Sequence, residues 1–106
     1  MTLEEIAKLP VMQTKAIAEA VSNNQKAGGY IVNCLLRFMA GDFGTVPAED
    51  AAANLAELES GEGHLLGRYK KAEGLDDDIY INAYFSEELR DDIDANHIML
   101  LFAEEW

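Results

Sequence analysis

Cysteine is almost absent from this sequence, since Cys34 is the only one among 106 residues. A lone cysteine excludes an intrachain disulfide framework and a thiolate metal cluster. Long apolar runs are also lacking, because no stretch approaches the ~20 residues that a membrane-spanning helix requires. The first ten residues, MTLEEIAKLP, have no basic start followed by a long apolar segment and so predict no signal peptide. These absences predict a cytoplasmic protein that does not enter a membrane.

Basic residues are few, with 8 Lys and Arg against 20 Asp and Glu, a net charge of −12 at pH 7. Residues 1–40 carry a net charge of +1, and residues 41–106 carry −13. Such a field repels phosphates, so direct nucleic-acid binding is not expected. The charge serves either to keep a small protein dispersed or to attract a partner with a basic protein surface.

The acidic residues of the C-terminal half suggest where such a partner would bind. The candidate acidic interaction surface consists of Asp76, Asp77, Asp78, Glu87, Glu88, Asp91 and Asp92. If these residues line one continuous stripe near the acids of 49–62, they could present carboxylates to a basic groove as DNA presents phosphates.

What the sequence does contain is enough apolar material for a core, because 49% of its residues are hydrophobic. A chain of this length predicts a single domain over residues 1–106. Apolar residues at three- and four-residue spacing predict a helix over 12–26. A break at 27–29, Ala-Gly-Gly, precedes a second helix over 30–40 that is expected to be buried nearly all round. A third helix is expected from Pro47 to about Glu59.

From Gly63 onward the apolar period changes from 3.6 to 2. This alternation predicts strands near 64–70, 79–85 and 97–102, with one side of the second strand against the core and Tyr80, Asn82 and Tyr84 on the other. Ser86 is a suitable cap for a short helix to about Asp94. The expected fold class is therefore α+β, with N-terminal helices packed on a small three-stranded antiparallel sheet formed by the C-terminal half.

Residues 92–97 resemble the start of a calcium loop, since Asp92, Asp94 and Asn96 alternate. An EF-hand needs Gly at its sixth position and Glu at its twelfth, but here these are His97 and Ala103. The EF-hand is excluded.

Two looser metal sites are compatible with the sequence. One is the run 76–78, although aspartate is common in turns because it bonds nearby amides. The other is a transition-metal site that His64 and His97 would share if their strands were adjacent. No metal and no cofactor is predicted.

Motifs for catalysis are missing. There is no G-x-S-x-G elbow, and Cys34 has no neighbouring histidine in the sequence, so it reads as a small core residue. The sequence therefore does not predict an enzyme.

Residues 35–106 resemble the small "plasmid-related protein" family of bacterial mobile elements. The residues that carry the likeness are Gly41, Asp42, Phe43 and Gly44; Glu49, Asp50 and Asn54; the segment 61–69; the segment 79–81; and the segment 101–106. The resemblance implies a mobile-element setting and supplies no established activity.

The family positions expected to be structural are Gly41, Asp42, Gly44, Asn54, Tyr69 and Trp106. Asp42 is expected to accept backbone amides in its turn, Asn54 to cap or bridge helix to sheet, and Trp106 to cover the open end of the core.

The chain departs from the family in two places. It has Asp94-Ala95-Asn96 where relatives carry Asp-Arg-Ser, and Ile98-Met99 where they carry two threonines. It also inserts an acidic segment, residues 86–93, between the second and third strands. If the Arg-Ser turn holds a functional site, that site is lost here.

The sequence does not determine the function. The leading expectation is a small acidic, non-catalytic accessory or protein-interaction protein of a mobile genetic element, of undetermined oligomeric state. The alternative is a DNA-mimicking inhibitor of a host defence nuclease, of the anti-restriction or anti-CRISPR kind.

Overall fold

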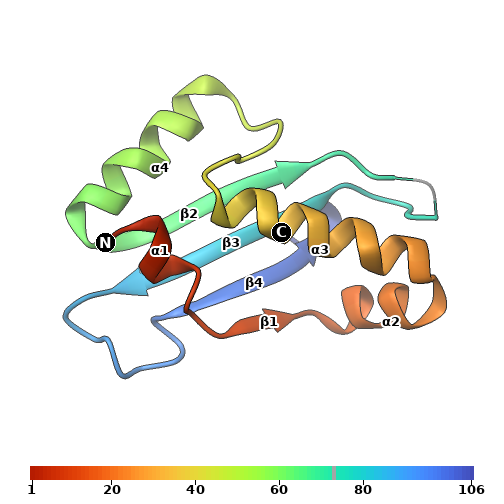
Figure 1. Ribbon diagram of the computed structural model, residues 1–106, viewed down its shortest axis with the longest axis horizontal. Helices are drawn as coiled ribbons and strands as arrows, with labels where there is room; N and C mark the ends of the chain where they lie inside the picture. Colours follow the sequence, from red (N-terminus) through yellow and green to blue (C-terminus); the bar gives the residue numbers. More distant parts are fainter. Residues whose placement is uncertain (73) are drawn as a thin grey trace.

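The computed structural model describes residues 1–72 and 74–106 (Figure 1). Its elements follow the chain in the order α1 (Leu3–Ile6), β1 (Val11–Gln13), α2 (Lys15–Asn23), α3 (Gln25–Met39), α4 (Ala48–Ser60), β2 (Glu62–Tyr69), β3 (Ile79–Ser86), β4 (His97–Phe102) and a 3-10 turn, η1 (Ala103–Glu105). The fold is α+β, as predicted from the change of apolar period along the chain.

The sheet has four strands in the order β1-β4-β3-β2, and it is mixed. Strands β2, β3 and β4 pair antiparallel, with Leu66 opposite Asn82 and Asn82 opposite Met99. Strand β1 pairs parallel with β4, where Met12 lies opposite Met99. The predicted three-stranded antiparallel sheet was therefore incomplete. Its missing strand has only three residues and finds its partner at the other end of the chain.

The predicted helix over 12–26 is two elements, because residues 11–13 form β1 and Thr14 caps α2 by accepting the Ile17 amide at 3.3 Å. The predicted break at 27–29 was wrong. Helix α3 begins at Gln25, and the Asn24 side chain caps it by accepting the amides of Lys26 and Ala27. Because an N-cap satisfies amides that a helix start leaves free, the two glycines continue the helix instead of ending it.

Gly28 serves the contact between α2 and α3. A Cβ at Gly28 would lie 3.3 Å from a methyl group of Val21, so its absence lets the two helices approach closely. Helix α3 is also amphipathic and not buried all round, since Val32 and Leu36 are 56% and 61% exposed. Its buried side carries Ala27, Ile31, Cys34 and Phe38.

Replacing Gly29 with alanine is expected to raise the free energy of unfolding by roughly 0.5–1 kcal/mol, because alanine loses less backbone freedom in a helix interior. No heavy atom lies within 4 Å of the added Cβ. The measurement is urea unfolding followed by circular dichroism. A loss of stability would mean that residues 27–29 are not helical.

Helix α4 agrees with the predicted third helix, and Gly61 ends it in the left-handed conformation with φ 77°. The predicted helix from Ser86 to Asp94 is instead a series of turns. The Asn96 amide donates to the carbonyls of Leu89 and Asp92 at 2.7 and 3.0 Å, and its oxygen accepts the Ser86 amide at 2.9 Å. The Asn96 side chain is 5% exposed. Its hydrogen bonds pair backbone groups that a helix would have paired by intrahelical bonds.

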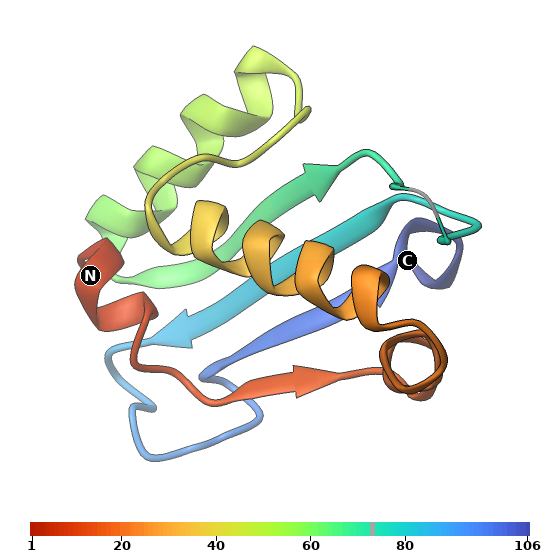
Figure 2. The same cartoon turned by 45° about the vertical axis from the view of Figure 1, so that its right-hand side comes forward.

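The core lies between the sheet and the helices α1, α2 and α3, which all lie on one side of the sheet (Figures 1 and 2). Helix α4 lies along the edge of β2. The core side of β3 consists of Ile79, Ile81, Ala83 and Phe85, each at most 2% exposed. No helix in the described part of the chain is long and apolar enough to cross a membrane.

Candidate binding face of the sheet

The side of the sheet that faces away from the core, here called the outer face, carries an unusual set of side chains. Strand alternation places on it Met12 of β1; Glu62, His64, Leu66 and Arg68 of β2; Tyr80, Asn82, Tyr84 and Ser86 of β3; and His97, Met99 and Leu101 of β4. No helix among the described residues covers these side chains, and Glu62, at the start of β2, is the one acidic residue among them. On a protein of net charge −12, this makes the outer face a distinct surface.

Four rings form a continuous row across the outer face. Tyr84 lies between the two histidines, with its centroid 5.1 Å from His97 and 5.5 Å from His64. The Trp106 indole lies 6.2 Å from His64 on the other side, with an interplanar angle of 23°. Aromatic planes in such offset stacks add about 0.5–1.5 kcal/mol per pair beyond the burial of their area.

The sequence suggested that Trp106 covers the open end of the core, but the structure places it elsewhere. Its ring lies 6.2 Å from that of His64 and 6.0 Å from that of Tyr80. These two residues flank the Leu66–Asn82 pair on neighbouring strands, so the indole lies over that pair on the outer face. The indole remains 60% exposed, which leaves one of its sides open to solvent.

The turn η1 positions Trp106. The Glu105 carboxylate accepts the Phe102 amide at 2.7 Å and the Thr14 hydroxyl at 2.9 Å. The Glu104 amide donates to Asp77 at 2.7 Å. These bonds reverse the chain at the end of β4 and return it towards the outer face.

Asn82 is the one polar side chain at the centre of the outer face, and it is 1% exposed. Within residues 1–72 and 74–106, neither its amide nitrogen nor its amide oxygen has a hydrogen-bond partner. A buried polar group left unpaired costs about 1–3 kcal/mol, so native proteins keep few of them. An unpaired amide here therefore calls for an explanation.

The edge of β2 beside the outer face is closed by side chain and loop. Asn54 of α4 bridges helix and sheet, donating to the Leu66 carbonyl at 2.9 Å and accepting the Leu66 amide at 3.0 Å. The Arg68 amide donates to the Phe43 carbonyl at 3.0 Å. Because this edge is paired, another chain is not expected to add to the sheet there.

The family-like positions around Gly41 hold the loop that closes this edge. Gly41 and Gly44 both have positive φ, 89° and 73°. Asp42 accepts the Gly44 amide at 3.0 Å, and its backbone carbonyl accepts the buried Tyr69 hydroxyl at 2.7 Å. Burial raises the pKa of Tyr69 far above its usual range, so the hydroxyl stays a donor. These contacts are architectural.

Two ion pairs flank the sheet. The Arg37 guanidinium lies 2.8 Å from Asp42 and lowers the pKa of that carboxyl, with help from the Gly44 amide. The Lys71 backbone amide lowers the pKa of Asp78, and Arg68, 3.0 Å away, lowers it further. Arg68 also lies over the Tyr80 ring, 5.4 Å from its centroid.

The Asp78 contacts predict a pH-dependent contribution to stability. A carboxyl whose pKa is lower in the folded state stabilises the fold above its unfolded pKa of about 3.9 and loses this effect as pH falls through the folded value. The wild type is therefore expected to be more stable than an Asp78→Asn variant at pH 6, and the difference should shrink by pH 3. Urea unfolding of both proteins at the two pH values measures it. An unchanged difference would contradict the assignment.

The seven candidate acidic residues form two separate groups. Residues 76–78 immediately precede β3, and residues 87–92 follow it, so the two groups lie at opposite ends of the sheet (Figure 1). A strand of eight residues spans about 26 Å. The DNA-mimic alternative depends on one continuous stripe, and the length of β3 separates the two groups.

The candidate metal ligands are also held apart. His64 and His97 lie on β2 and β4, with the Tyr84 ring of β3 between them. The Asp92 carboxylate accepts the Asp94 amide at 2.9 Å, as expected of a turn. Among the described residues, no three His, Cys, Asp or Glu side chains gather as a metal site would require. Cys34 is fully buried, and this burial raises the pKa of its thiol.

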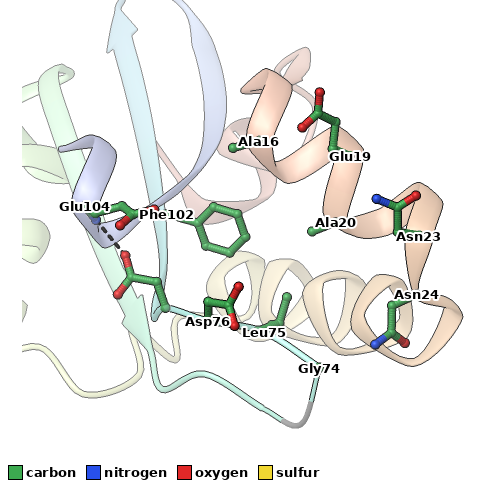
Figure 3. A pocket seen from close by; sticks show the side chains of 11 residues that line it. Ala16, Glu19, Ala20, Asn23, Asn24, Gly74, Leu75, Asp76, Phe102 and Glu104 are labelled. Carbon is green, nitrogen blue, oxygen red and sulfur yellow. Dashed lines mark hydrogen bonds between the residues drawn. The ribbon is translucent and has the colours of Figure 1, made fainter.

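A pocket of about 320 Å³ lies between α2, η1 and the segment before β3 (Figure 3). Phe102, Leu75 and two alanines of α2 form its apolar floor. The acidic side chains around it are Glu19, Asp76, Asp77 and Glu104. Within the described residues, no buried unpaired group points into this pocket, so its acids alone do not select a ligand.

Sequence alternation placed Tyr80, Asn82 and Tyr84 on the side away from the core, but it did not mark them as a site. Nothing in the sequence indicated that Trp106 lies beside Tyr80, because this contact forms only after the chain reverses at η1. Comparison of this chain with family profiles, curated proteins and solved structures finds no match.

Proposed function

We propose that the protein is a non-catalytic interaction module that docks a basic partner protein on its outer face. The observation that carries the proposal is an aromatic surface with one acidic residue, Glu62, at its margin, uncovered by helices among the described residues, on a protein of net charge −12. An antiparallel sheet with one solvated side normally carries polar residues there. Here tyrosine, methionine and leucine take several of those places, beside His64, Arg68, Asn82 and His97.

The residue types of the outer face match those of protein interfaces. Aromatic residues, methionine and arginine are enriched at interface centres, where charged carboxylates are depleted. Large contiguous apolar patches that stay exposed on a small protein mark interaction sites. Met12 and Trp106, at 41% and 60% exposed, lie at its borders.

Charge around the outer face selects a basic partner. Asp50 and Glu57 of α4 line a hollow beside Trp106. Asp77 and Asp78 lie at the end of β3, next to η1. An apolar centre with an acidic rim fits a partner whose own apolar patch is bordered by Lys and Arg, since complementary charge steers association. We also propose that the protein belongs to a mobile genetic element, because residues 35–106 resemble the plasmid-related protein family.

The proposal is tested by placing a charge on the outer face. His64→Asp puts a carboxylate within the ring row, and Val32→Asp puts one on an exposed apolar position of α3 as a control. Wild type and both variants, each checked for native unfolding behaviour, are used to retain proteins from a lysate of the cell that carries the gene.

A partner with a basic surface, kept by wild type and Val32→Asp and lost by His64→Asp, would support the proposal. Retention that is equal for all three proteins would contradict it, as would a partner that binds through α3.

A further inference from the structure

We propose that the outer face also binds a purine base in the slot over Asn82, which the Trp106 indole occupies in the free protein. The ligand class is an uncharged planar ring system with a hydrogen-bond donor and an acceptor side by side, as at the edges of adenine. This inference concerns a small-molecule ligand and does not depend on the proposed protein partner.

The Asn82 amide defines what the ligand must offer. A carboxamide presents one acceptor oxygen and a donor nitrogen next to each other. Both atoms are buried and unpaired among the described residues. The complementary partner must therefore supply a donor and an acceptor in one plane, and an asparagine paired with the 6-amino group and N7 of adenine is a known pattern of this kind.

The rings around Asn82 define the shape of the ligand. The slot over the Leu66–Asn82 pair already holds a fused five- and six-membered ring, because the indole stacks near His64 and meets Tyr80 at 60°. A purine has the same fused outline. The indole has only a donor, and it makes no bond to Asn82, so it fills the slot without satisfying the amide.

Trp106 has somewhere to go when the ligand enters. A hollow of about 180 Å³ lies between the indole and helix α4, bordered by Ala53, Asn54 and Leu66. The indole is 60% exposed, and the Trp106 amide donates only within the η1 turn, to the Ala103 carbonyl at 3.2 Å. Displacing the indole therefore breaks no hydrogen bond to the sheet within residues 1–72 and 74–106.

Charge decides which form of purine enters. The protein carries −12, and the hollow beside the slot is lined by Asp50 and Glu57. A phosphate near this site is repelled, so an unphosphorylated base or nucleoside is favoured over a nucleotide or a strand of nucleic acid.

The test uses Trp106 itself, the only tryptophan of the chain. Adenosine is titrated into the full-length protein while the indole emission and the Asn82 side-chain amide signals in ¹H–¹⁵N spectra are recorded. The same titration with purine riboside, which lacks the 6-amino donor, and with the Asn82→Leu variant, provides matched controls. Adenosine monophosphate and oligoadenylate identify the source of the base.

Saturable changes of both signals with adenosine are expected, with binding at least tenfold weaker for purine riboside and for Asn82→Leu. Trp106→Ala should bind adenosine at least as tightly, because the competing indole is gone. Tighter binding of the monophosphate or of oligoadenylate would support a base site but contradict the inference that the ligand is unphosphorylated. No saturable change up to ~10 mM adenosine, about ten times a Kd of 1 mM, would overturn the proposal. So would equal binding by Asn82→Leu. Neither result would affect the test of His64→Asp.

Discussion

Replacing Phe38 with alanine is expected to lower the free energy of unfolding by about 4 kcal/mol, the largest effect of any single truncation proposed for this fold. Phe38 is fully buried. Its ring meets Phe43 edge-on, with centroids 5.7 Å apart at 74°. A Cβ at Gly67 would lie 2.8 Å from the Phe38 ring, so the ring packs directly on the backbone of β2. Alanine would leave a cavity between α3 and the sheet.

The matched control is Leu36→Ala, two residues away on the same helix and 61% exposed. It is expected to change stability by less than about 0.5 kcal/mol, as is usual for surface sites. Urea unfolding of both variants gives the comparison. Equal losses would mean that α3 packs on the sheet through a different side from the one described.

Replacing Gly44 with alanine is expected to cost about 3 kcal/mol, the second largest effect. Two terms combine, since φ at Gly44 is 73° and an added Cβ would overlap the Arg68 carbonyl oxygen. That oxygen accepts the Thr45 amide at 2.7 Å, so the overlap also disrupts the pairing that closes the edge of β2. A left-handed non-glycine residue alone costs about 1–3 kcal/mol.

Gly41→Ala separates these two terms. Its φ of 89° is also positive, but its added Cβ would meet only a flexible methyl group of Leu3 at 3.1 Å. A loss of about 1 kcal/mol is expected from the backbone term. If both glycine variants lose the same amount, the contact between residues 43–45 and β2 contributes nothing to stability.

The strands at 79–86 and 97–102 could be predicted because their alternation reflects local burial on one side. The same logic failed for residues 11–13. A three-residue strand has too few positions to show a period, and its parallel partner Ile98–Leu100 lies far along the chain. Residues 27–29 misled for a related reason, because the packing of Gly28 on Val21 outweighs the poor helix propensity of glycine.

The candidate site was only partly predictable. Period-two alternation put Tyr80, Asn82 and Tyr84 on one side of a strand, but it did not place Trp106 beside Tyr80. That placement follows from the Glu105 and Asp77 contacts of η1, which no local pattern encodes. The charge run predicted an acidic surface but not its division between the two ends of the sheet.

The free energy of unfolding of Asn82→Leu tests most directly whether the amide on the outer face is kept for binding. Leucine has a similar volume and removes an amide that is buried and unpaired among the described residues. Replacing such a group by an apolar one is neutral or stabilising. The variant is therefore expected to be at least as stable as the wild type while losing adenosine binding. A loss of about 2 kcal/mol or more would show that Asn82 belongs to a satisfied structural network, and it would contradict the account of the outer face.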